Sequence, residues 1–457
     1  MKKMRVFLAL LAARLVRFAL RITKRGGTAL PGKVALKICP DLLTVLARDV
    51  KVLIVTGTNG KTTSCRIAEQ LMQEAGYRYF ANRGGANLVQ GITTEFAMHA
   101  CLSGRPKQEY AVIECDEAVM PEVCRRVQPV CILVTNVFAD QVDRFGGVDH
   151  TVEVIRKGIM NAPAAAVCLN ADCSMLAEMS EGLENPLFFY GVDVPLYRER
   201  VNEISDAPRC PKCGTDFAYR WHTYGHLGGF ACPGCGFARP EPAVRVTRLV
   251  QSTLDGSRIE ISLQGRRHTA AVAVPGGYNV YNAAGVASAG TALGLDDDVI
   301  LRALGNFTCG FGRMEKMQLA GNAARMILVK NPAGCNQTLN FLSNIDGSAL
   351  FVIAINDNVG DGTDIGWIYD ADFEKLLGLG ERLTGLYCAG ARGAEMALRL
   401  KYAGFPMEKI RVFADYESLI AAMEEQTGDI VMMPTYSAMM ELRGKLAARY
   451  GLKEFWE

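Results

Sequence analysis

The sequence predicts an α/β protein with a larger domain built on a mostly parallel sheet and a smaller, Rossmann-like α/β domain near its C-terminal end. Short apolar runs alternate with helix-like segments from Val52 to Cys173, and the alternation starts again at Ala349. A glycine-rich turn joins the first apolar run to a helix-like segment. Strands that alternate with helices form right-handed crossovers, which favour parallel sheets covered on both faces.

A basic, apolar segment precedes the first apolar run, and we expect an amphipathic helix and a linker over residues 1–45. Arg14, Arg17 and Arg21 recur in it at helical spacing and exclude a membrane span. The cleavage site of a secretory signal does not follow. The helix either packs on the globular body, which we favour because such helices are the commoner case, or lies on an anionic membrane surface.

The glycine-rich turn, VTGTNGKTTS, has the composition of a phosphate-binding loop. Gly57 and Gly60 allow backbone N–H groups to close on an anion, and the N-terminus of the following helix adds partial positive charge. Lys61 can reach the terminal phosphates, and the Thr62 hydroxyl can bind Mg²⁺. The common pattern places a glycine at position 55, where this chain has Val55, so the loop is a variant. The residues predicted to hold a nucleotide are Gly57, Thr58, Asn59, Gly60, Lys61, Thr62 and Thr63.

Three further strands are expected at 110–117, 131–136 and 165–173. Ligands of parallel sheets bind at the carboxyl ends of the strands. The polar residues at these ends should therefore face the phosphate loop; they are Glu114, Asp116, Glu117, Asn136, Asn170 and Asp172.

Four of the fifteen cysteines form two C-x-x-C pairs separated by eighteen residues. Each pair is followed by a glycine that permits a tight turn, and four thiolates can close a tetrahedral Zn²⁺ site without an open position. We expect a structural zinc ribbon over residues 205–240, inserted in the larger domain, with Phe217, Tyr219, Trp221 and Tyr224 as its small core. Its predicted ligands are Cys210, Cys213, Cys232 and Cys235.

The remaining cysteines are scattered singly through apolar runs, which indicates a reducing, cytoplasmic compartment. The formal net charge of the 457 residues is only +2, which argues against a nucleic-acid-binding protein. Every uninterrupted apolar segment of the sequence is shorter than the ~20 residues that a membrane-spanning helix needs. The larger domain is expected over residues 46–312 and the smaller one over residues 313–457.

Three motifs follow one another along the chain: VTGTNGKTTS, then GGYNVYNAAGVASAG at 276–290, then GFGRMEKM at 310–317. This order resembles the Mur ligase superfamily, whose members use ATP to phosphorylate a carboxylate that an amine then attacks. The ribbon and the stretches GANLVQGIT, ECDEAVMP, ADQVDRFG, KNPAGCNQTL and INDNVGDGTDIGWIYDADFEKL extend the resemblance over essentially the whole chain. They are similar to the MurT family, the ligase subunits of lipid II isoglutaminyl synthases. The implied fold has a Mur ligase-type central P-loop ATPase domain.

The resemblance implies an enzyme of cell-wall synthesis that uses ATP, Mg²⁺ and a structural Zn²⁺. A glutaminase partner of the GatD type would supply ammonia, and the α-carboxylate of D-glutamate in the stem peptide of lipid II would become the amide of D-isoglutamine. ADP and phosphate are the other implied products. We expect the chain in the cytoplasm, and whether it also contacts the inner face of the membrane stays open. Mur ligases carry a nucleotide-sugar-binding domain before the loop, and only about fifty residues precede Thr56 here, so we expect a UDP-linked substrate to lack its usual binding domain.

The resemblance also implies roles for residues at matching positions. Lys61 and the backbone amides of residues 58–62 would bind the β- and γ-phosphates, and Glu114 would join Thr62 on Mg²⁺. Asn282 matches the adenine-binding asparagine of these ligases. Arg313 would contact the nucleotide or the acyl phosphate.

A second set of expectations concerns the loop at 355–376. Asp364 matches the aspartate that completes the catalytic Cys-His pair of the glutaminase partner, although Asp357 and Asp361 lie in the same loop and spacing alone does not choose among them. Five positions depart from residues expected in the family and put local substrate contacts in question: Ala139, Gly147, Gly360, Thr363 and Gly366.

Three alternatives stay open at this point. A Mur-type ligase that adds an amino acid, of the folylpolyglutamate or muramyl-peptide type, would work without a glutaminase. A zinc-ribbon protein that binds nucleic acid would show a clustered basic face and salt-sensitive binding. A scaffold without catalysis would not need Lys61, Thr62 and Glu114, all of which are present.

Overall fold

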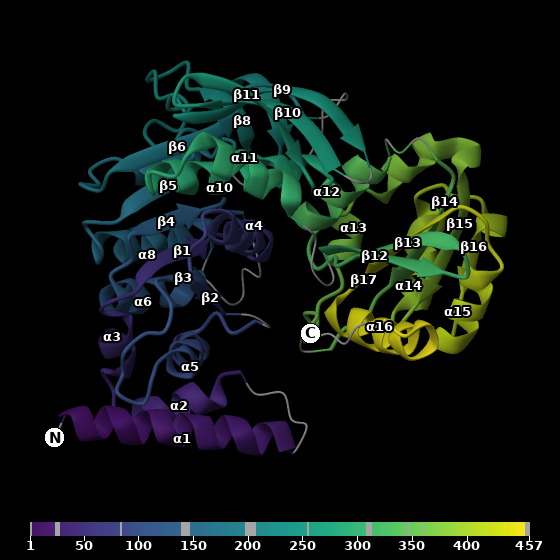
Figure 1. Ribbon diagram of the computed structural model, residues 1–457. Helices are drawn as coiled ribbons and strands as arrows, with labels where there is room; N and C mark the ends of the chain where they lie inside the picture. The colour runs from purple at the N-terminus through teal and green to yellow at the C-terminus, as the bar shows by residue number, and fades with distance from the viewer. Residues whose placement is uncertain are drawn as a thin grey trace. The chain divides into compact units, whose positions relative to one another are not determined.

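The computed structural model describes residues 2–22, 28–82, 85–138, 147–196, 207–253, 256–307, 313–343, 345, 347–358 and 360–452. The chain divides into two compact units, shown with their elements in Figure 1. The first comprises Met1–Ser252, Ser257–Ala273 and Tyr278–Phe307, and the second comprises Thr253–Gly256, Val274–Gly277 and Thr308–Glu457. The exact domain limits expected from the sequence stay predictions.

The first unit contains a nine-stranded sheet in the order β11-β10-β9-β6-β5-β4-β1-β3-β2. The described pairings from β2 to β9 are parallel, and β10 pairs with β11 antiparallel. The predicted parallel-rich α/β fold is therefore confirmed. The strands are β1 (Lys51–Thr56), β2 (Tyr79–Ala81), β3 (Tyr110–Glu114), β4 (Cys131–Val134), β5 (Ala166–Asn170), β6 (Leu187–Val192), β9 (Val244–Thr253), β10 (Gly256–Leu263) and β11 (Arg266–Val272).

Helices connect these strands, as the alternating pattern predicts. The helices α4, α6 and α8 follow β1, β3 and β4, respectively. Their apolar faces are buried because each carries apolar residues at helical spacing. The described helices of this part of the chain after β1 are α4 (Lys61–Glu74), α5 (Val89–His99), α6 (Met120–Val127), α8 (Val148–Met160), α9 (Ser174–Met179), α10 (Gly277–Ala292) and α11 (Asp297–Asn306), with the 3₁₀ turn η1 (Glu117–Val119).

Strand β1 lies in the interior of the sheet, between β3 and β4. Its residues Val52–Val55 are completely buried. Val55 pairs with Glu114 on β3, and Thr56 pairs with Val134 on β4. Because the three strands are parallel, their carboxyl ends lie side by side, and the phosphate loop leaves the sheet between the ends of β3 and β4.

Three helices precede β1: α1 (Lys2–Ile22), α2 (Leu30–Ile38) and α3 (Leu42–Ala47). Helix α1, the purple helix in Figure 1, packs on α2 and α5. Val6, Ala9, Leu10 and Ala13 form its buried face. The preferred sequence interpretation, a helix packed on the body, is confirmed for this face. In the described part of the chain, the helices are too short or too polar to cross a membrane.

The second unit contains a six-stranded sheet in the order β12-β13-β17-β14-β15-β16. Only the β12–β13 pairing is antiparallel among the described pairings. Phe351 and Ile353 of β14 belong to one apolar cluster, and Leu350 and Val352 to another, so both faces of the sheet are covered. The strands are β12 (Arg313–Leu319), β13 (Asn322–Ile327), β14 (Ala349–Ala354), β15 (Leu383–Ala389), β16 (Ile410–Val412) and β17 (Asp429–Pro434).

The helices of the second unit alternate with its strands from β13 onward. They are α12 (Pro332–Leu342), α13 (Trp367–Asp370), α14 (Gly393–Tyr402), α15 (Tyr416–Glu424) and α16 (Tyr436–Tyr450), with the 3₁₀ segments η2 (Phe373–Arg382) and η3 (Met407–Lys409). The loop after β14 carries the three aspartates singled out in the sequence.

Candidate active site

The phosphate loop has the backbone conformation that its glycines predict. Gly57 and Gly60 adopt φ angles of 117° and 83°, which side-chain-bearing residues rarely adopt. Helix α4 begins directly afterwards at Lys61, so its first N–H groups lack partners within the helix. The start of α4 therefore offers backbone donors and the positive end of the helix dipole to an anion.

Asn136, just beyond β4, fixes the first half of this loop. Its carbonyl accepts a hydrogen bond from Thr58 N (2.9 Å), and its Oδ1 accepts one from Asn59 N (3.0 Å). Phe138 N donates to Thr58 Oγ1 over 3.0 Å. The N–H groups of Thr58 and Asn59, which were expected to bind phosphate, are thus already bonded to Asn136, whereas the first N–H groups of α4 have no partner within the helix. Asn136 faces the loop, as expected.

The Lys61 ammonium folds back over the loop. Nζ donates to Gly57 O over 2.5 Å and to Glu117 Oε1 over 2.8 Å. The Lys61 and Glu117 side chains are only 15% and 13% exposed, so this ion pair is poorly screened by solvent. Glu117 was expected to face the loop, but its pairing with Lys61 could not be deduced from sequence.

Thr62 and Glu114 meet at the end of β3. Thr62 Oγ1 donates to Glu114 Oε2 over 2.8 Å. The backbone of Glu114 is held by Asn82, which accepts from Glu114 N and donates to Glu114 O, both over 2.8 Å. Two side-chain oxygens of a kind that can bind a cation therefore lie together at the loop. Asn82 is a positioning residue that the sequence did not single out.

Helix α10 places Asn282 directly on the loop. A Cβ atom built on Gly60 would lie 2.1 Å from Asn282 Oδ1, so only glycine allows this approach. Asn282 is buried, and its amide donates to Asn279 Oδ1 over 2.9 Å. Arg313 is the first residue of β12, where it pairs with Ile327, and its side chain lies outside the described residues.

The other polar residues at strand ends do not all face the loop. Asp116 caps η1 through Ala118 N, and Asn170 donates to Thr135 O. Asp172 bonds Tyr281 OH over 2.6 Å and Arg239 Nε over 2.6 Å. The expectation for Asp172 is therefore wrong, because its side chain satisfies donors from other segments, and the expectation for Asp116 stays a prediction.

The loop after β14 distinguishes its three aspartates. Asp357 Oδ2 accepts from Arg392 Nη2 over 2.7 Å. Asp361 is buried and accepts from the Ser437 hydroxyl and the Ser437 N–H. Asp364 is exposed; its Oδ1 accepts from Gly366 N over 2.7 Å, and its Oδ2 accepts no hydrogen bond from a residue that the structure describes. Asp364 thus has a carboxylate oxygen open to another molecule.

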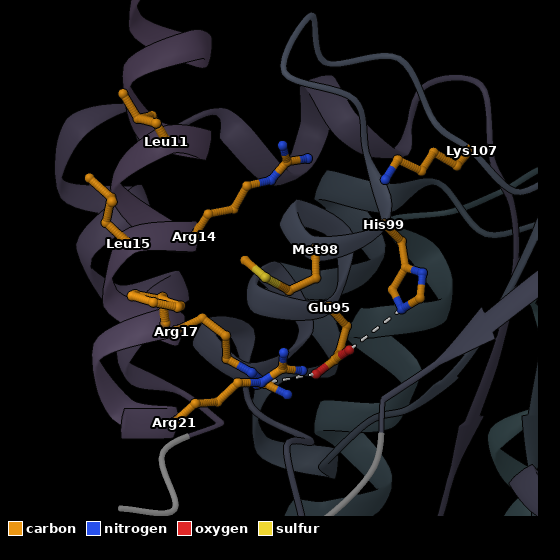
Figure 2. A pocket seen from close by; sticks show the side chains of 10 residues that line it. Leu11, Arg14, Leu15, Arg17, Arg21, Glu95, Met98, His99 and Lys107 are labelled. Atoms are coloured by element: carbon orange, nitrogen blue, oxygen red, sulfur yellow. Dashed lines mark ion pairs between the residues drawn. The ribbon is translucent and has the colours of Figure 1, made fainter. Parts of the chain in front are cut away.

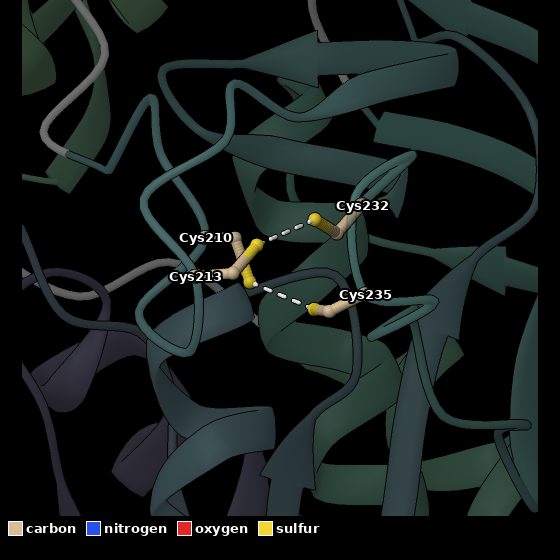
Figure 3. A group of neighbouring side chains, drawn as sticks. All are labelled: Cys210, Cys213, Cys232 and Cys235. Carbon is tan, nitrogen blue, oxygen red and sulfur yellow. Dashed lines mark hydrogen bonds between the residues drawn. The ribbon is translucent and has the colours of Figure 1, made fainter.

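The four clustered cysteines converge on one point (Figure 3). All four sulfurs lie within 4.8 Å of one another, with Cys213–Cys232 and Cys210–Cys235 separations of 3.4 and 3.5 Å. A tetrahedral zinc site with ~2.3 Å Zn–S bonds has sulfurs about 3.8 Å apart, so the donor set fits Zn²⁺. Hydrogen bonding between Cys213 and the side chain and backbone of Thr215 lowers the pKa of Cys213 to about 6, which favours the ligating thiolate.

Backbone turns position these thiols. Gly214 N donates to Cys210 O, and Gly236 N donates to Cys232 O, with both glycines at positive φ. Strands β7 (Ala218–Tyr224) and β8 (Leu227–Ala231) form the two-stranded sheet between the pairs. The predicted ribbon ligands are therefore close enough to share one ion.

We predict that the purified chain contains about one Zn²⁺ per molecule, and that Cys232→Ser removes it and lowers the melting temperature, because structural zinc contributes to folding. Elemental analysis and thermal unfolding measure both effects. Cys101→Ser is the matched control, since Cys101 is exposed and lies outside the cluster. Full zinc content in the Cys232 variant would contradict the ligand assignment.

Trp221, which was expected to lie in the small core of the ribbon, instead connects the ribbon to the large sheet. Phe217 packs on Phe230 with ring centroids 5.0 Å apart, as expected. Trp221 Nε1, however, donates to Val192 O on β6 over 2.8 Å, and Arg239 stacks over the Trp221 ring. The prediction for Trp221 is corrected accordingly, and the side chain of Tyr224 lies outside the described residues.

The ion pair between Arg239 and the completely buried Asp172 completes this attachment. Burial raises the pKa of Asp172, and the Arg239 charge opposes that effect. Val192 N and Tyr281 OH both donate to Asp172 Oδ2. The Asp172 carboxylate therefore connects strand β6, helix α10 and the end of the ribbon.

Comparison with protein families gives two matches. Residues 55–209 match the Mur ligase middle domain, and residues 328–439 match the MurT ligase C-terminal family. The chain is 34% identical, over 97% of both sequences, to the MurT subunit of lipid II isoglutaminyl synthase (glutamine-hydrolyzing) from Streptococcus pneumoniae. It is 31% identical to the Staphylococcus aureus (strain COL) MurT subunit, over 97% of this chain and 98% of that one.

Solved structures agree on the fold. A pseudomurein peptide ligase type C from Methanothermus fervidus superposes with a TM-score of 0.65 and 22% identity, over 88% of this chain and 79% of that one. MurF ligase from Thermotoga maritima in complex with ADP gives a TM-score of 0.61 and 16% identity, over 92% and 85%. Folylpolyglutamate synthase from Mycobacterium tuberculosis gives 0.58 and 14%, over 93% and 99%.

The parallel sheet, the phosphate loop and the second α/β unit together define a ligase of the Mur type. Within this class, the 34% and 31% identity to two MurT subunits, over nearly their whole length, shows the family of the chain. The chain belongs to the MurT family of Mur ligases.

Proposed function

We propose that this chain is the ATP-dependent ligase subunit of a lipid II isoglutaminyl synthase. The α-carboxylate of D-glutamate in the lipid II stem peptide receives the γ-phosphoryl group of ATP, and ammonia then attacks the acyl carbon and displaces phosphate. The products are the D-isoglutamine amide, ADP and phosphate. A GatD-type glutaminase hydrolyses glutamine to supply the ammonia, and the reaction takes place in the cytoplasm. The observation that carries the proposal is the 34% identity with a relative named as this subunit.

In this proposal the nucleotide phosphates bind at the start of α4. The N–H groups of Lys61, Thr62 and Thr63 are the donors that the loop leaves for an anion, while Gly57, Thr58, Asn59 and Gly60 set the loop shape. The Lys61 ammonium, now paired with Glu117, exchanges this carboxylate for the β- and γ-phosphates. Glu117 thus neutralises the ammonium before the nucleotide binds.

Thr62 and Glu114 are the residues proposed to hold Mg²⁺. Mg²⁺ prefers oxygen ligands in octahedral geometry, in which adjacent oxygens lie about 2.9 Å apart. The 2.8 Å between Thr62 Oγ1 and Glu114 Oε2 fits this spacing. When bound, the cation offsets the repulsion between the phosphates and the substrate carboxylate.

Asn282 and Arg313 complete the proposed nucleotide site. The buried Asn282 amide beside Gly60 supports a direct contact to the nucleotide, and family resemblance assigns it to the adenine edge. Arg313 is assigned by resemblance alone, to the nucleotide or the acyl phosphate. The proposed order of phosphoryl transfer followed by attack of ammonia does not depend on these two assignments.

Asp364 is proposed to complete the catalytic Cys-His pair of the glutaminase. An aspartate that accepts a hydrogen bond from the far nitrogen of a catalytic histidine fixes its tautomer and supports its charge. Asp357 is paired with Arg392 through Oδ2 and Asp361 is buried against Ser437, whereas Asp364 is exposed and accepts a hydrogen bond from the backbone of its own turn. This difference supports Asp364 over its two neighbours. Ammonia is then released only when both subunits are assembled.

The test is amidation of lipid II by the purified chain with its cognate glutaminase, ATP and Mg²⁺, followed by mass spectrometry of the stem peptide. We expect amide formation with glutamine only when both proteins are present, and with ammonium chloride when this chain is alone. Omission of ATP is the control. If the chain instead joins a free amino acid to a carboxylate and ignores ammonia, the amino-acid-adding ligase replaces this proposal.

A further inference from the structure

Helix α1 has a second apolar face, opposite the one that packs on the body. Its seven large side chains recur three or four residues apart and are 38% to 67% exposed: Met4, Phe7, Leu8, Leu11, Leu15, Phe18 and Ile22. Such spacing places them on one side of the helix. We call this face the α1 stripe. An α-helix of 21 residues is about 30 Å long, so the α1 stripe is a long and continuous apolar surface.

The charge of α1 is entirely positive. Its sequence contains six basic residues and no aspartate or glutamate: Lys2, Lys3, Arg5, Arg14, Arg17 and Arg21. Lys3, Arg5 and Arg21 are exposed. On a helical projection at 100° per residue, Lys3 and Arg21 border the α1 stripe on one side, and Arg5 lies beyond its other side. The helix thus combines an exposed apolar stripe with positive flanks.

A cavity of about 660 Å³ lies alongside the stripe (Figure 2). Leu11 and Leu15 point away from the body, whereas Arg14, Arg17 and Arg21 point toward α5. Met98, His99 and Glu95 of α5, together with Lys107 and Phe18, complete the lining.

Positive charge dominates this cavity. Arg17 pairs loosely with Glu95, at 4.0 Å, and Arg14 donates to Ala100 O. Arg21 and Lys107 form no ion pair with any side chain in the described part of the chain. Four cationic side chains therefore share one carboxylate, which suits an anionic group.

We propose that α1 lies flat on an anionic lipid bilayer, with the α1 stripe among the acyl chains and the adjoining cavity facing the lipid phosphates. Interfacial helices have this combination of a broad apolar face, basic flanks and no acidic residue. Charge complementarity favours an anionic bilayer over a second copy of the chain, because two such helices would bring like charges together. Helix α1 is already folded and held by its inner face, so binding need not order it. The inference goes beyond the proposed function and does not depend on catalysis.

The test is flotation of the full chain with vesicles that contain phosphatidylglycerol and cardiolipin but no lipid II. A failed amidation assay and a failed flotation assay are therefore separate results. We expect the wild-type chain to float with these vesicles, to stay unbound with pure phosphatidylcholine vesicles, and to dissociate as salt is raised. Lack of flotation by the wild-type chain would overturn the proposal.

Two pairs of matched variants assign the binding surface. Leu15→Ser with Phe18→Ser should weaken vesicle binding about tenfold or more. Leu398→Ser with Tyr402→Ser is its control, because that pair is also exposed on a helix, α14. Arg21→Glu should weaken binding, and Lys401→Glu, also exposed on α14, should not. Thermal unfolding checks that each variant is folded.

Two results with these variants would overturn the proposal. One is unchanged vesicle binding by the Leu15 and Phe18 double variant. The other is loss of self-association by this variant in sedimentation velocity without vesicles, which would assign the α1 stripe to a contact between copies.

Discussion

Replacing Lys61 with alanine is expected to lower the kcat of amidation about 10²- to 10³-fold, the range typical for loss of one electrostatic contact to a developing charge. Lys61 Nζ lies over the phosphate loop, 2.8 Å from Glu117 Oε1, and is the cation that the loop itself provides. Phosphoryl transfer spreads negative charge over the γ-phosphate oxygens, which this ammonium offsets. Phosphate release from ATP, with lipid II and ammonium chloride, measures the effect without the glutaminase.

Lys51→Ala is the matched control for this variant. Lys51 is exposed at the start of β1, ten residues before Lys61, and lies over the Tyr110 ring. Its loss removes the same charge but not the phosphate contact, so the rate should stay within about twofold of wild type. Lys61→Arg should not restore the rate fully, because a guanidinium does not reproduce a compact ammonium. Undiminished turnover by Lys61→Ala would remove Lys61 from the reaction.

Replacing Asp364 with asparagine is expected to lower glutamine hydrolysis by the assembled complex about 10³- to 10⁴-fold, as when the aspartate of a catalytic triad is lost. The amide cannot support the charge of the partner's histidine and favours the wrong tautomer. Amidation supported by ammonium chloride should stay unchanged, because Asp364 is proposed to serve only ammonia production. Glutamate release and amide formation, measured on the same sample, separate the two effects.

Asp370→Asn is the control for the aspartate prediction. Asp370 is exposed on α13, six residues away, and its substitution removes the same charge from the same segment. Co-purification of the subunits shows that assembly is intact. Full hydrolysis by Asp364→Asn, together with loss of hydrolysis by Asp357→Asn, would transfer the role to Asp357 despite its pairing with Arg392.

The features that were predictable from sequence are those set by local chemistry. Gly57 and Gly60 indicated the loop because few other residues adopt its positive φ angles, and the structure has both. The two C-x-x-C pairs indicated a cluster because each pair forms its own turn, and their sulfurs do converge. Alternating apolar runs likewise predicted the parallel sheets, whose strands need buried residues on both faces.

The features that could not be predicted depend on contacts between distant segments. Glu117 pairs with Lys61 across 56 positions, and Trp221 reaches the backbone of β6. Asp172 was expected at the phosphate loop, but Arg239 and Tyr281 bind it elsewhere. Periodicity locates a strand end, but it does not specify which distant donor satisfies a carboxylate there.

The loop after β14 shows the same limit on a smaller scale. The sequence offered three aspartates within eight positions, and family register alone favoured Asp364. The structure separates them by their partners, because Arg392 and Ser437 come from segments 35 and 76 positions away. These tertiary contacts support the proposal of Asp364, which was first made from family register.

The central claim is that this chain activates the α-carboxylate of D-glutamate as an acyl phosphate. It is tested most directly with lipid II that carries ¹⁸O in that carboxylate, incubated with the chain, its glutaminase partner, ATP, Mg²⁺ and glutamine. We predict that one ¹⁸O atom per amide formed appears in the released inorganic phosphate, because ammonia displaces the oxygen that the phosphoryl group received. Amide formation with unlabelled phosphate would contradict an acyl phosphate intermediate and, with it, the role assigned to the phosphate loop.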